Sequence, residues 1–211
     1  MKPLILLGGG GHCKSVIEAA ESQGREILGI FDMPEDMEKN VFSTKFIGTD
    51  DDIPRYVDKA DFVITVGFIK NPFTRIKLYN RVKEEGGKLA TIIASTAYVS
   101  KYATIGEGTV IMHHAFVNAG ARIGNNVIIN SFANIEHDAV IGDQCHISTG
   151  AMVNGDCQVG NNSFIGSQSV LANGITVGED IIVGAGSLVR KSIHRKGVYS
   201  GNPAILKIKA K

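Results

Sequence analysis

An aliphatic residue stands at every sixth position through the second half of the chain. The column holds sixteen residues, all of them Ile, Val or Leu: Val99, Ile105, Ile111, Val117, Ile123, Ile129, Ile135, Ile141, Ile147, Val153, Val159, Ile165, Leu171, Val177, Val183 and Val189. Four positions further on, most hexads have a small residue: Ala103, Thr109, Ala115, Ala121, Ala133, Ala139, Cys145, Ala151, Cys157, Ser163 and Ser169. One short strand and one turn per hexad explain both columns, because the aliphatic side chain enters a narrow core and the small one fits where the chain bends. The pattern predicts a parallel β-helix.

A glycine column shows that three hexads form one coil. The residue after the aliphatic position is glycine at intervals of 18: Gly106, Gly124, Gly142, Gly160 and Gly178. On a second side the same column contains polar residues, among them Asn118 and Glu136. We therefore expect roughly five triangular coils with unequal sides. The repeat has no insertion between residues 99 and 189, so any site must be formed by coil surfaces and by neighbouring chains.

The first 92 residues follow a different pattern, in which apolar runs alternate with helical spacing. We expect strands at 2–7, 26–31, 61–66 and 88–93, and helices at 13–23, 50–57 and 71–85. Such alternation predicts a small parallel α/β domain. The predicted organisation is a Rossmann-like nucleotide-sugar-binding domain over residues 1–93, a β-helix over 94–195 and a tail over 196–211.

A run of four glycines, residues 8–11, lies between the first expected strand and the first expected helix. Backbone N–H groups in such a loop can hold a phosphate. The third glycine of the dinucleotide motif is replaced by Cys13, and Asp32 ends the second strand, where a ribose-binding carboxylate belongs. His12 and Lys14 add donors to the loop. The alternative is a plain tight turn with a solvated Asp32.

Composition and charge narrow the class of protein. The chain has 22 Lys and Arg against 21 Asp and Glu, which argues against binding nucleic acid by bulk charge. No apolar run approaches the ~20 residues of a membrane span, and the apolar start is too short for a signal peptide. Three cysteines without CxxC spacing fit a reducing compartment. We expect a cytoplasmic protein.

Taken together, these features resemble a known family. The glycine-rich cap, the uninterrupted hexads, the segment IEHDAVIG at 135–142 and the ending GNPA at 201–204 resemble the left-handed β-helix acyltransferases. More narrowly, they are similar to the bacterial UDP-4-amino-sugar N-acetyltransferases and the related sialic-acid O-acetyltransferase-like proteins. The resemblance implies a left-handed coil, a homotrimer, and acetyl-CoA in the groove between adjacent rods, with no metal.

The resemblance also implies roles for particular residues. The general base matches His137 and its acidic neighbour matches Asp138. His146 would contact the thioester region of CoA, and the remaining positions around CoA match Gly155, Ser167 and Ala185. The UDP-sugar positions match Gly10, Gly11, His12, Cys13, Asp32 and Gly67. Two positions depart from the family pattern: Met33 replaces a frequent second Asp, and Ile205 follows GNPA where Lys or Arg is frequent.

Acetyl transfer explains why a histidine beside a carboxylate would be needed. A thioester is already activated, but a protonated sugar amine is no nucleophile, so a base must accept its proton as nitrogen attacks. A neutral histidine suits this task near pH 7, and a carboxylate can orient the imidazole and stabilise its cation.

Other readings of the same residues remain open. The acceptor could be a sugar hydroxyl, or the protein could be a nucleotide-binding trimer without activity. A metal held between subunits could take its ligands from His113, His114, His137 and His146. For His113 and His114 the simpler interpretation is that their side chains are solvated or pack between the chains of a trimer. The seven basic residues after Ile181 could bind CoA phosphates or form a solvated end.

Overall fold

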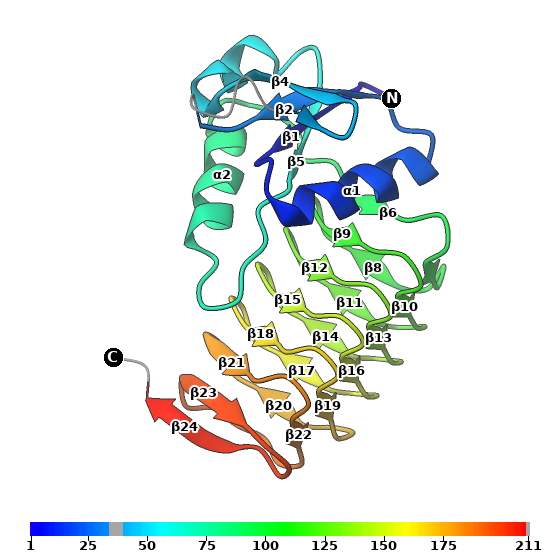
Figure 1. Cartoon of the computed structure of the whole chain (residues 1–211). Helices are drawn as coiled ribbons and strands as arrows, with labels where there is room; N and C mark the ends of the chain where they lie inside the picture. The colour runs from blue at the N-terminus through cyan, green and yellow to red at the C-terminus, as the bar shows by residue number, and fades with distance from the viewer. Residues whose placement is uncertain (34–39, 210–211) are drawn as a thin grey trace.

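The computed structural model describes residues 1–33 and 40–209 and places an α/β cap on one end of a long rod (Figure 1). The cap sheet has the strand order β3-β4-β2-β1-β5. Its strands are β1 (Leu4–Leu7), β2 (Ile27–Phe31), β3 (Asn40–Val41), β4 (Thr44–Gly48) and β5 (Asp61–Ile64). All its pairs are parallel except β3 with β4. The connections contain α1 (Gly11–Ser22), a 3₁₀ helix (Asp50–Arg55) and α2 (Phe73–Glu84).

The cap and the rod share a hydrophobic core. Every residue of β1 is fully buried, as a central parallel strand requires. Helix α1 packs Val16 and Ile17 into a cluster that also includes Val110 and Ile128 of the rod. The helix therefore lies between the cap sheet and the first coils, as Figure 1 shows. This continuous packing fixes the cap on the rod.

Three sheets form the sides of the rod, and their strands are parallel except for the last strand of the chain. The covered sheet, which lies beneath the cap, contains β6 (Ile92–Ile93), β9 (Val110–Ile111), β12 (Ile128–Ile129), β15 (His146–Ile147), β18 (Phe164–Ile165), β21 (Ile181–Val183), β23 (Gly197–Ser200) and β24 (Ile205–Lys209). The apolar sheet contains β7 (Tyr98–Val99), β10 (Phe116–Val117), β13 (Asn134–Ile135), β16 (Met152–Val153), β19 (Val170–Leu171) and β22 (Leu188–Val189). The polar sheet contains β8 (Thr104–Ile105), β11 (Arg122–Ile123), β14 (Val140–Ile141), β17 (Gln158–Val159) and β20 (Thr176–Val177).

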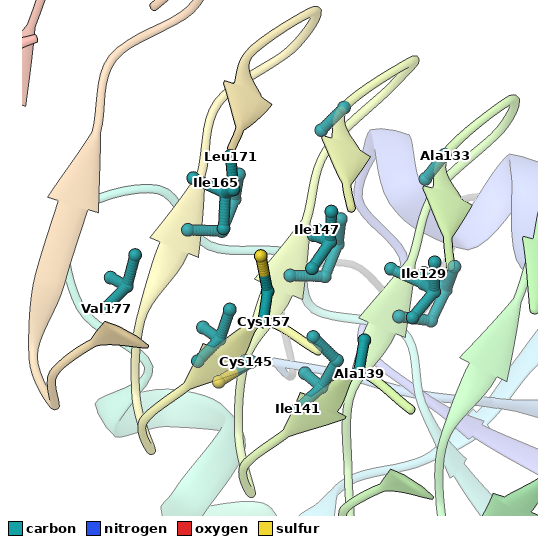
Figure 2. Packing of buried hydrophobic residues seen from close by; sticks show 14 of the residues in the cluster. Ile129, Ala133, Ala139, Ile141, Cys145, Ile147, Cys157, Ile165, Leu171 and Val177 are labelled. Atoms are coloured by element: carbon teal, nitrogen blue, oxygen red, sulfur yellow. The ribbon is translucent and has the colours of Figure 1, made fainter. Parts of the chain in front are cut away.

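The predicted aliphatic column points into the rod, as Figure 2 shows for its middle coils. Val99 and Ile105 in the first coil are only partly buried, whereas the column is buried from Ile111 onward. The small residues occupy the corners, and several of them satisfy buried carbonyl groups. Ser163 Oγ, for example, donates to the carbonyl of Gly178, and Cys145 Sγ to that of Gly160.

Each corner depends on one residue with a positive φ. From Gly108 to Gly186, the third residue after the aliphatic position is always in this conformation, and it is glycine or a residue such as Asn126 or Asp138. Asn, Asp and Gly adopt this region at the lowest cost. Phe132 also adopts it, although a bulky residue is unusual there.

The glycine column follows from how closely the coils stack. A Cβ on Gly142 would lie 2.8 Å from the backbone N of Asn161 and 3.1 Å from the backbone C of Gly160. At the same corner, side chains bridge successive coils, because Asn125 N–H donates to Asp143 and Asp143 N–H donates to Asn161. Close stacking and this ladder together exclude a side chain at the glycine position.

The structure corrects the expected elements at three places. The run 88–93 is not one strand of the cap: Leu89 pairs with Phe62 of the cap, but β6 pairs with β9 and begins the covered sheet. The β3–β4 hairpin was not predicted. The end of the chain extends the covered sheet, because β23 pairs with β21 and β24 folds back on β23. The remaining cap helices and strands lie close to where they were expected.

The substitution Gly142→Ala should destabilise the rod, because its Cβ meets backbone that cannot move away. We expect a loss of about 1–3 kcal/mol in the free energy of unfolding, the usual cost of overpacking, measured by denaturant unfolding. Asn154→Ala is the matched control, since it changes the same hexad position at a corner that already carries a side chain. Equal stability of the two variants would contradict this account of the glycine column.

Candidate active site

His137 and Asp138 form a pair at the corner between the apolar and polar sheets. Both side chains are exposed, by 60% and 66%, and His137 Nδ1 lies 2.9 Å from Asp138 Oδ2. Asp138 has a φ of +61°, so the turn brings its carboxylate back to the ring of its neighbour. Because a carboxylate only accepts hydrogen bonds, the neutral imidazole carries its proton on Nδ1 and keeps a free lone pair on Nε2.

The hydrogen bond that His137 donates to Asp138 is the main reason that the pKa of His137 lies above its ordinary value, and the negative charges of Glu136 and Asp156 act in the same direction. Glu136 itself is held by the side-chain amides of Asn118 and Asn134, which lower its pKa. The histidine is therefore a stronger base than an isolated imidazole.

Glycines leave room for the pair on both neighbouring coils. A Cβ on Gly155, one coil further along, would lie 2.7 Å from His137 Nε2. A Cβ on Gly120, one coil back, would clash with a carboxylate oxygen of Asp138. The structure thus brings together His137, Asp138 and Gly155 from the predicted site.

His146 lies at a different place. It begins β15 on the outer face of the covered sheet, where it is only 7% exposed. Its Nδ1 lies 2.8 Å from the carbonyl oxygen of Phe68, and the rings of Phe68 and Phe164 pack edge-on against it. Burial lowers its pKa to about 4, so the ring is neutral. His146 is neither a solvated turn residue nor a contact of His137 within one chain.

Ser167 and Ala185 lie at the corner between the covered and apolar sheets. Ser167 Oγ lies 2.9 Å from Ser148 Oγ on the previous coil. His146 is connected to this corner by Asn130, which lies there and whose Nδ2 is 3.4 Å from His146 Nε2. The residues predicted to surround CoA therefore lie at two different corners. Gly155 lies at the same corner as His137, and the others lie on the opposite side of the apolar sheet.

The four glycines of the cap loop serve two purposes. Gly8 has a φ of +105°, and a Cβ there would meet Val66 at 2.5 Å, so the fold itself requires glycine. A Cβ on Gly9 would clash with the ring of Phe46. Nothing lies within 4 Å of a Cβ on Gly10 or Gly11, where α1 begins. The open space therefore lies at the helix N-terminus, where backbone N–H groups favour an anion.

A pocket of about 310 Å³ opens beside this helix N-terminus. Gly9, Gly10, Lys14, Asp32, Asn40, Val41 and Phe46 line it. Asp32 Oδ2 accepts a hydrogen bond from Gly9 N–H at 2.5 Å, so its carboxylate shapes the glycine loop as well as the pocket wall. The sequence did not reveal the part of the wall from the β3–β4 hairpin, because that hairpin carries no recognisable motif.

The other predicted cap residues lie outside this pocket. Cys13 is buried in the core, where burial raises its pKa to about 11, so its side chain is not available to a ligand. His12 lies against Gly67, on the side that faces the rod. Burial lowers the pKa of His12 to about 3, and in the described part of the chain its buried Nε2 has no hydrogen-bond partner.

His113 and His114 belong to the same corner as Ser167, near the cap. His113 Nδ1 lies 2.8 Å from Thr96 Oγ1, and His114 stacks on the exposed ring of Phe132. Within residues 1–33 and 40–209, no group of three or more His, Cys, Asp or Glu side chains is arranged to hold a metal. No helix in these ranges is long and apolar enough to cross a membrane.

Comparisons with known proteins agree with this architecture. The family model of the PglD N-terminal domain matches residues 3–82, and that of the bacterial transferase hexapeptide (six repeats) matches residues 120–155 and 156–191. A search of curated protein sequences found no match.

Solved structures resemble the chain over nearly its whole length. The acetyltransferase domain of PglB from Neisseria gonorrhoeae FA1090 is 30% identical with a TM-score of 0.90, covering 98% of this chain and 100% of that one. A mutant of perosamine N-acetyltransferase from Caulobacter crescentus, in complex with CoA and GDP-perosamine, is 29% identical with a TM-score of 0.91, covering 98% and 97%. WeeI from Acinetobacter baumannii AYE, at 22% identity and a TM-score of 0.87, shares the fold over 98% of this chain and 100% of its own.

The cap and the repeats together define an acyltransferase of the hexapeptide-repeat class. The chain belongs to the branch of these acetyltransferases that acts on nucleotide-linked amino-sugars.

The titration of His137 should depend on its partner. In the native protein its pKa should exceed the ordinary value of 6.5, and Asp138→Asn should lower it, because removing a nearby anion destabilises the imidazolium. Asparagine also tolerates the positive φ at this position. NMR titration of the imidazole measures both values.

Asp156→Asn is the control for this titration, since Asp156 occupies the matching position of the next coil with a φ of +59°. Its backbone N–H donates to the carbonyl oxygen of His137, but its side chain makes no hydrogen bond to the His137 ring. Its effect on the pKa should be clearly smaller. A pKa that responds equally to both substitutions would mean that the 2.9 Å contact does not control the base.

Proposed function

We propose that this chain transfers the acetyl group of acetyl-CoA to the amino group of a UDP-linked amino-sugar, with His137 as the general base. The pairing of His137 with Asp138 at an exposed corner carries this proposal, because it leaves Nε2 free to accept a proton. The N. gonorrhoeae domain bound to acetyl coenzyme A and the C. crescentus enzyme bound to CoA and GDP-perosamine support the reaction class.

In the proposed reaction the sugar nitrogen attacks the thioester carbonyl while its proton passes to His137 Nε2. Asp138 holds the imidazole in the productive tautomer and stabilises the imidazolium that forms. The collapse of the tetrahedral intermediate then breaks the C–S bond, and the departing thiolate of CoA takes the proton from the imidazolium, which releases CoA as the thiol and restores the neutral base. The space above Gly155 would admit the amine to Nε2.

The cap pocket would hold the nucleotide. The N–H groups of Gly10 and Gly11 at the start of α1 would bind the diphosphate. Asp32 lines the same pocket and would face the ribose, with Lys14 as a further cation. His12 and Gly67 would lie toward the sugar, on the side of the cap that faces the rod. Cys13 would contribute only through its backbone.

A second copy of the chain would complete the site. The proposed CoA residues His146, Ser167 and Ala185 lie on or near the covered–apolar corner, whereas His137 and Gly155 stand at the apolar–polar corner. The outer face of the sheet between them is rich in apolar side chains: Tyr98, Phe116, Met152, Val170 and Leu188. If three rods turn this sheet toward a common axis, the two corners of neighbouring chains come together. This arrangement supports a homotrimer with acetyl-CoA between rods.

Thiol release from acetyl-CoA tests the reaction. The full-length protein is assayed with UDP-linked 4-amino-sugars, with GDP-perosamine, and with matched UDP-sugars that carry a hydroxyl in place of the amine. The proposal predicts release only with an amino-sugar, and the fastest release with a UDP-linked one. Faster transfer to the hydroxyl compounds would contradict N-acetylation, and nucleotide binding without any release would contradict an enzyme.

His137→Ala should lower kcat by roughly 10²- to 10⁴-fold, the usual contribution of a general base. The affinity for acetyl-CoA should change little, because the base acts on the amine. Asp138→Asn should move the acidic limb of the pH–rate profile to lower pH and reduce the plateau, since the imidazole becomes both more acidic and less well oriented. Near-normal turnover by His137→Ala would rule out this base.

Gly11→Val should weaken nucleotide binding without disturbing the fold. Nothing lies within 4 Å of a Cβ at this residue, so the side chain would fill open space where a phosphate should approach. Calorimetric titration with UDP should show a loss of affinity, while acetyl-CoA binding and the melting temperature stay close to those of the native protein. Unchanged UDP affinity would place the diphosphate elsewhere.

A further inference from the structure

A buried arginine joins the cap to the rod. Arg75, in the first turn of α2, is 0% exposed. One nitrogen of its guanidinium donates to the carbonyl oxygens of Ile64 at 3.0 Å and Val66 at 2.7 Å. A second nitrogen, Nη2, donates to Asn126, to the carbonyl oxygen at 3.1 Å and to Oδ1 at 2.5 Å. Among the described residues, no carboxylate lies within ion-pair distance of this guanidinium.

The rod side of this contact spans two coils. Asn126 is a fully buried corner residue with a φ of +52°. Its Nδ2 donates to Gln144 Oε1 at 2.6 Å, and Gln144 is the matching residue of the next coil. Arg75 is therefore anchored to a rigid, repeating part of the molecule.

The cap side of the contact leads to the proposed nucleotide pocket. The carbonyls of Ile64 and Val66 flank Thr65, whose hydroxyl donates to the carbonyl oxygens of Leu7 and Gly8 at the start of the glycine loop. Two residues beyond Val66, the same segment places Phe68 over His146. The segment 64–68 thus links the glycine loop to the covered sheet, and Arg75 hydrogen-bonds to the carbonyl groups in its first half.

Holding two surfaces together with a buried arginine requires the desolvation of its charge. Burying a charge without a counter-charge is costly, and an apolar side chain would pack the same space at lower cost. The rest of α2 is packed in that way by Leu78 and Val82. What a guanidinium adds is a planar set of donors with fixed directions, which sets geometry more strictly than apolar packing does.

We propose that Arg75 and Asn126 are a positioning pair that sets the segment 64–68, and with it the glycine loop, relative to the acyl-transfer surface of the rod. This role rests on the proposed function, because it matters only if the cap presents a substrate to the rod. The pair touches neither substrate, so it acts through alignment. A misplacement of about 1 Å can cost roughly 100-fold in rate.

Asn126→Gly removes the side chain of the pair and keeps the backbone conformation, because glycine readily adopts a φ of +52°. We expect kcat for the best amino-sugar substrate to fall by roughly 10- to 100-fold. The KM for acetyl-CoA and the dissociation constant for UDP should stay within about twofold of native values, because each half-site keeps its own residues and only their relative position changes. Asn126→Asp keeps an acceptor for Arg75 and should recover most of the lost rate.

Asn162→Gly is the matched control. Asn162 occupies the same corner two coils further on, with a φ of +62°, and makes no hydrogen bond to Arg75. It should leave kcat unchanged. A native kcat in Asn126→Gly, with only a lower melting temperature, would overturn the proposal and leave the pair a purely structural role. A loss of UDP affinity as large as the loss of kcat would also overturn the proposal.

A second measurement does not depend on catalysis. The backbone amide resonances of Gly10 and Gly11 should shift in Asn126→Gly and stay in place in Asn162→Gly, and unmoved resonances in both would refute the coupling. A native protein that acetylates no amino-sugar would contradict the proposed function. An active native protein with an unaffected Asn126→Gly would contradict the positioning role alone.

Discussion

The stacking of one coil directly on the next is the constraint on which the rest of this structure depends. Each turn lies so close to its neighbour that a single added carbon at Gly142 meets backbone atoms of the next coil. The turns also need one residue of positive φ in nearly every hexad. The repeat also has no insertion between residues 99 and 189, so no segment of the rod leaves the surface to build a pocket. Chemistry is limited to the outer faces and the corners, where side chains such as His137 are exposed.

The candidate site uses this constraint in two ways. At the apolar–polar corner, the positive φ of Asp138 folds its carboxylate against the neighbouring imidazole, and Gly155 leaves space beside the ring. Because the rod itself forms no pocket there, the cap would have to provide specificity for the substrate. The cap can do so only if its position on the rod is fixed, and the shared core around α1 and the contact of Arg75 with Asn126 both fix it.

The sequence was most informative where structure depends on local rules. The inward columns, the three-hexad coil and the strand–glycine–helix start of the cap all follow from residues close together in the chain. The structure confirms these predictions. The contact between His137 and Asp138 could be anticipated from their place at a turn, although neighbours on a strand would point apart.

Features that depend on contacts between distant segments were missed. Leu89 and Ile92 are three residues apart but belong to different sheets, and no local pattern marks the change. No local pattern indicated that His146 is buried, because Phe68, which covers it, lies 78 residues earlier in the chain. Nothing in the sequence singled out Arg75, which lies in the helix expected at 71–85. Its burial depends on where α2 meets Asn126, 51 residues later.

The account depends most on whether the base and the CoA groove come from different chains. Co-expression of His137→Ala with Ala185→Trp, which should block the groove, tests this directly once each variant alone is shown to be inactive. If the site lies between copies, random assembly gives about one quarter of the sites an intact His137 and an intact groove, and about that fraction of native activity returns. A mixture as inactive as its components would mean that one chain supplies both, and would contradict the account.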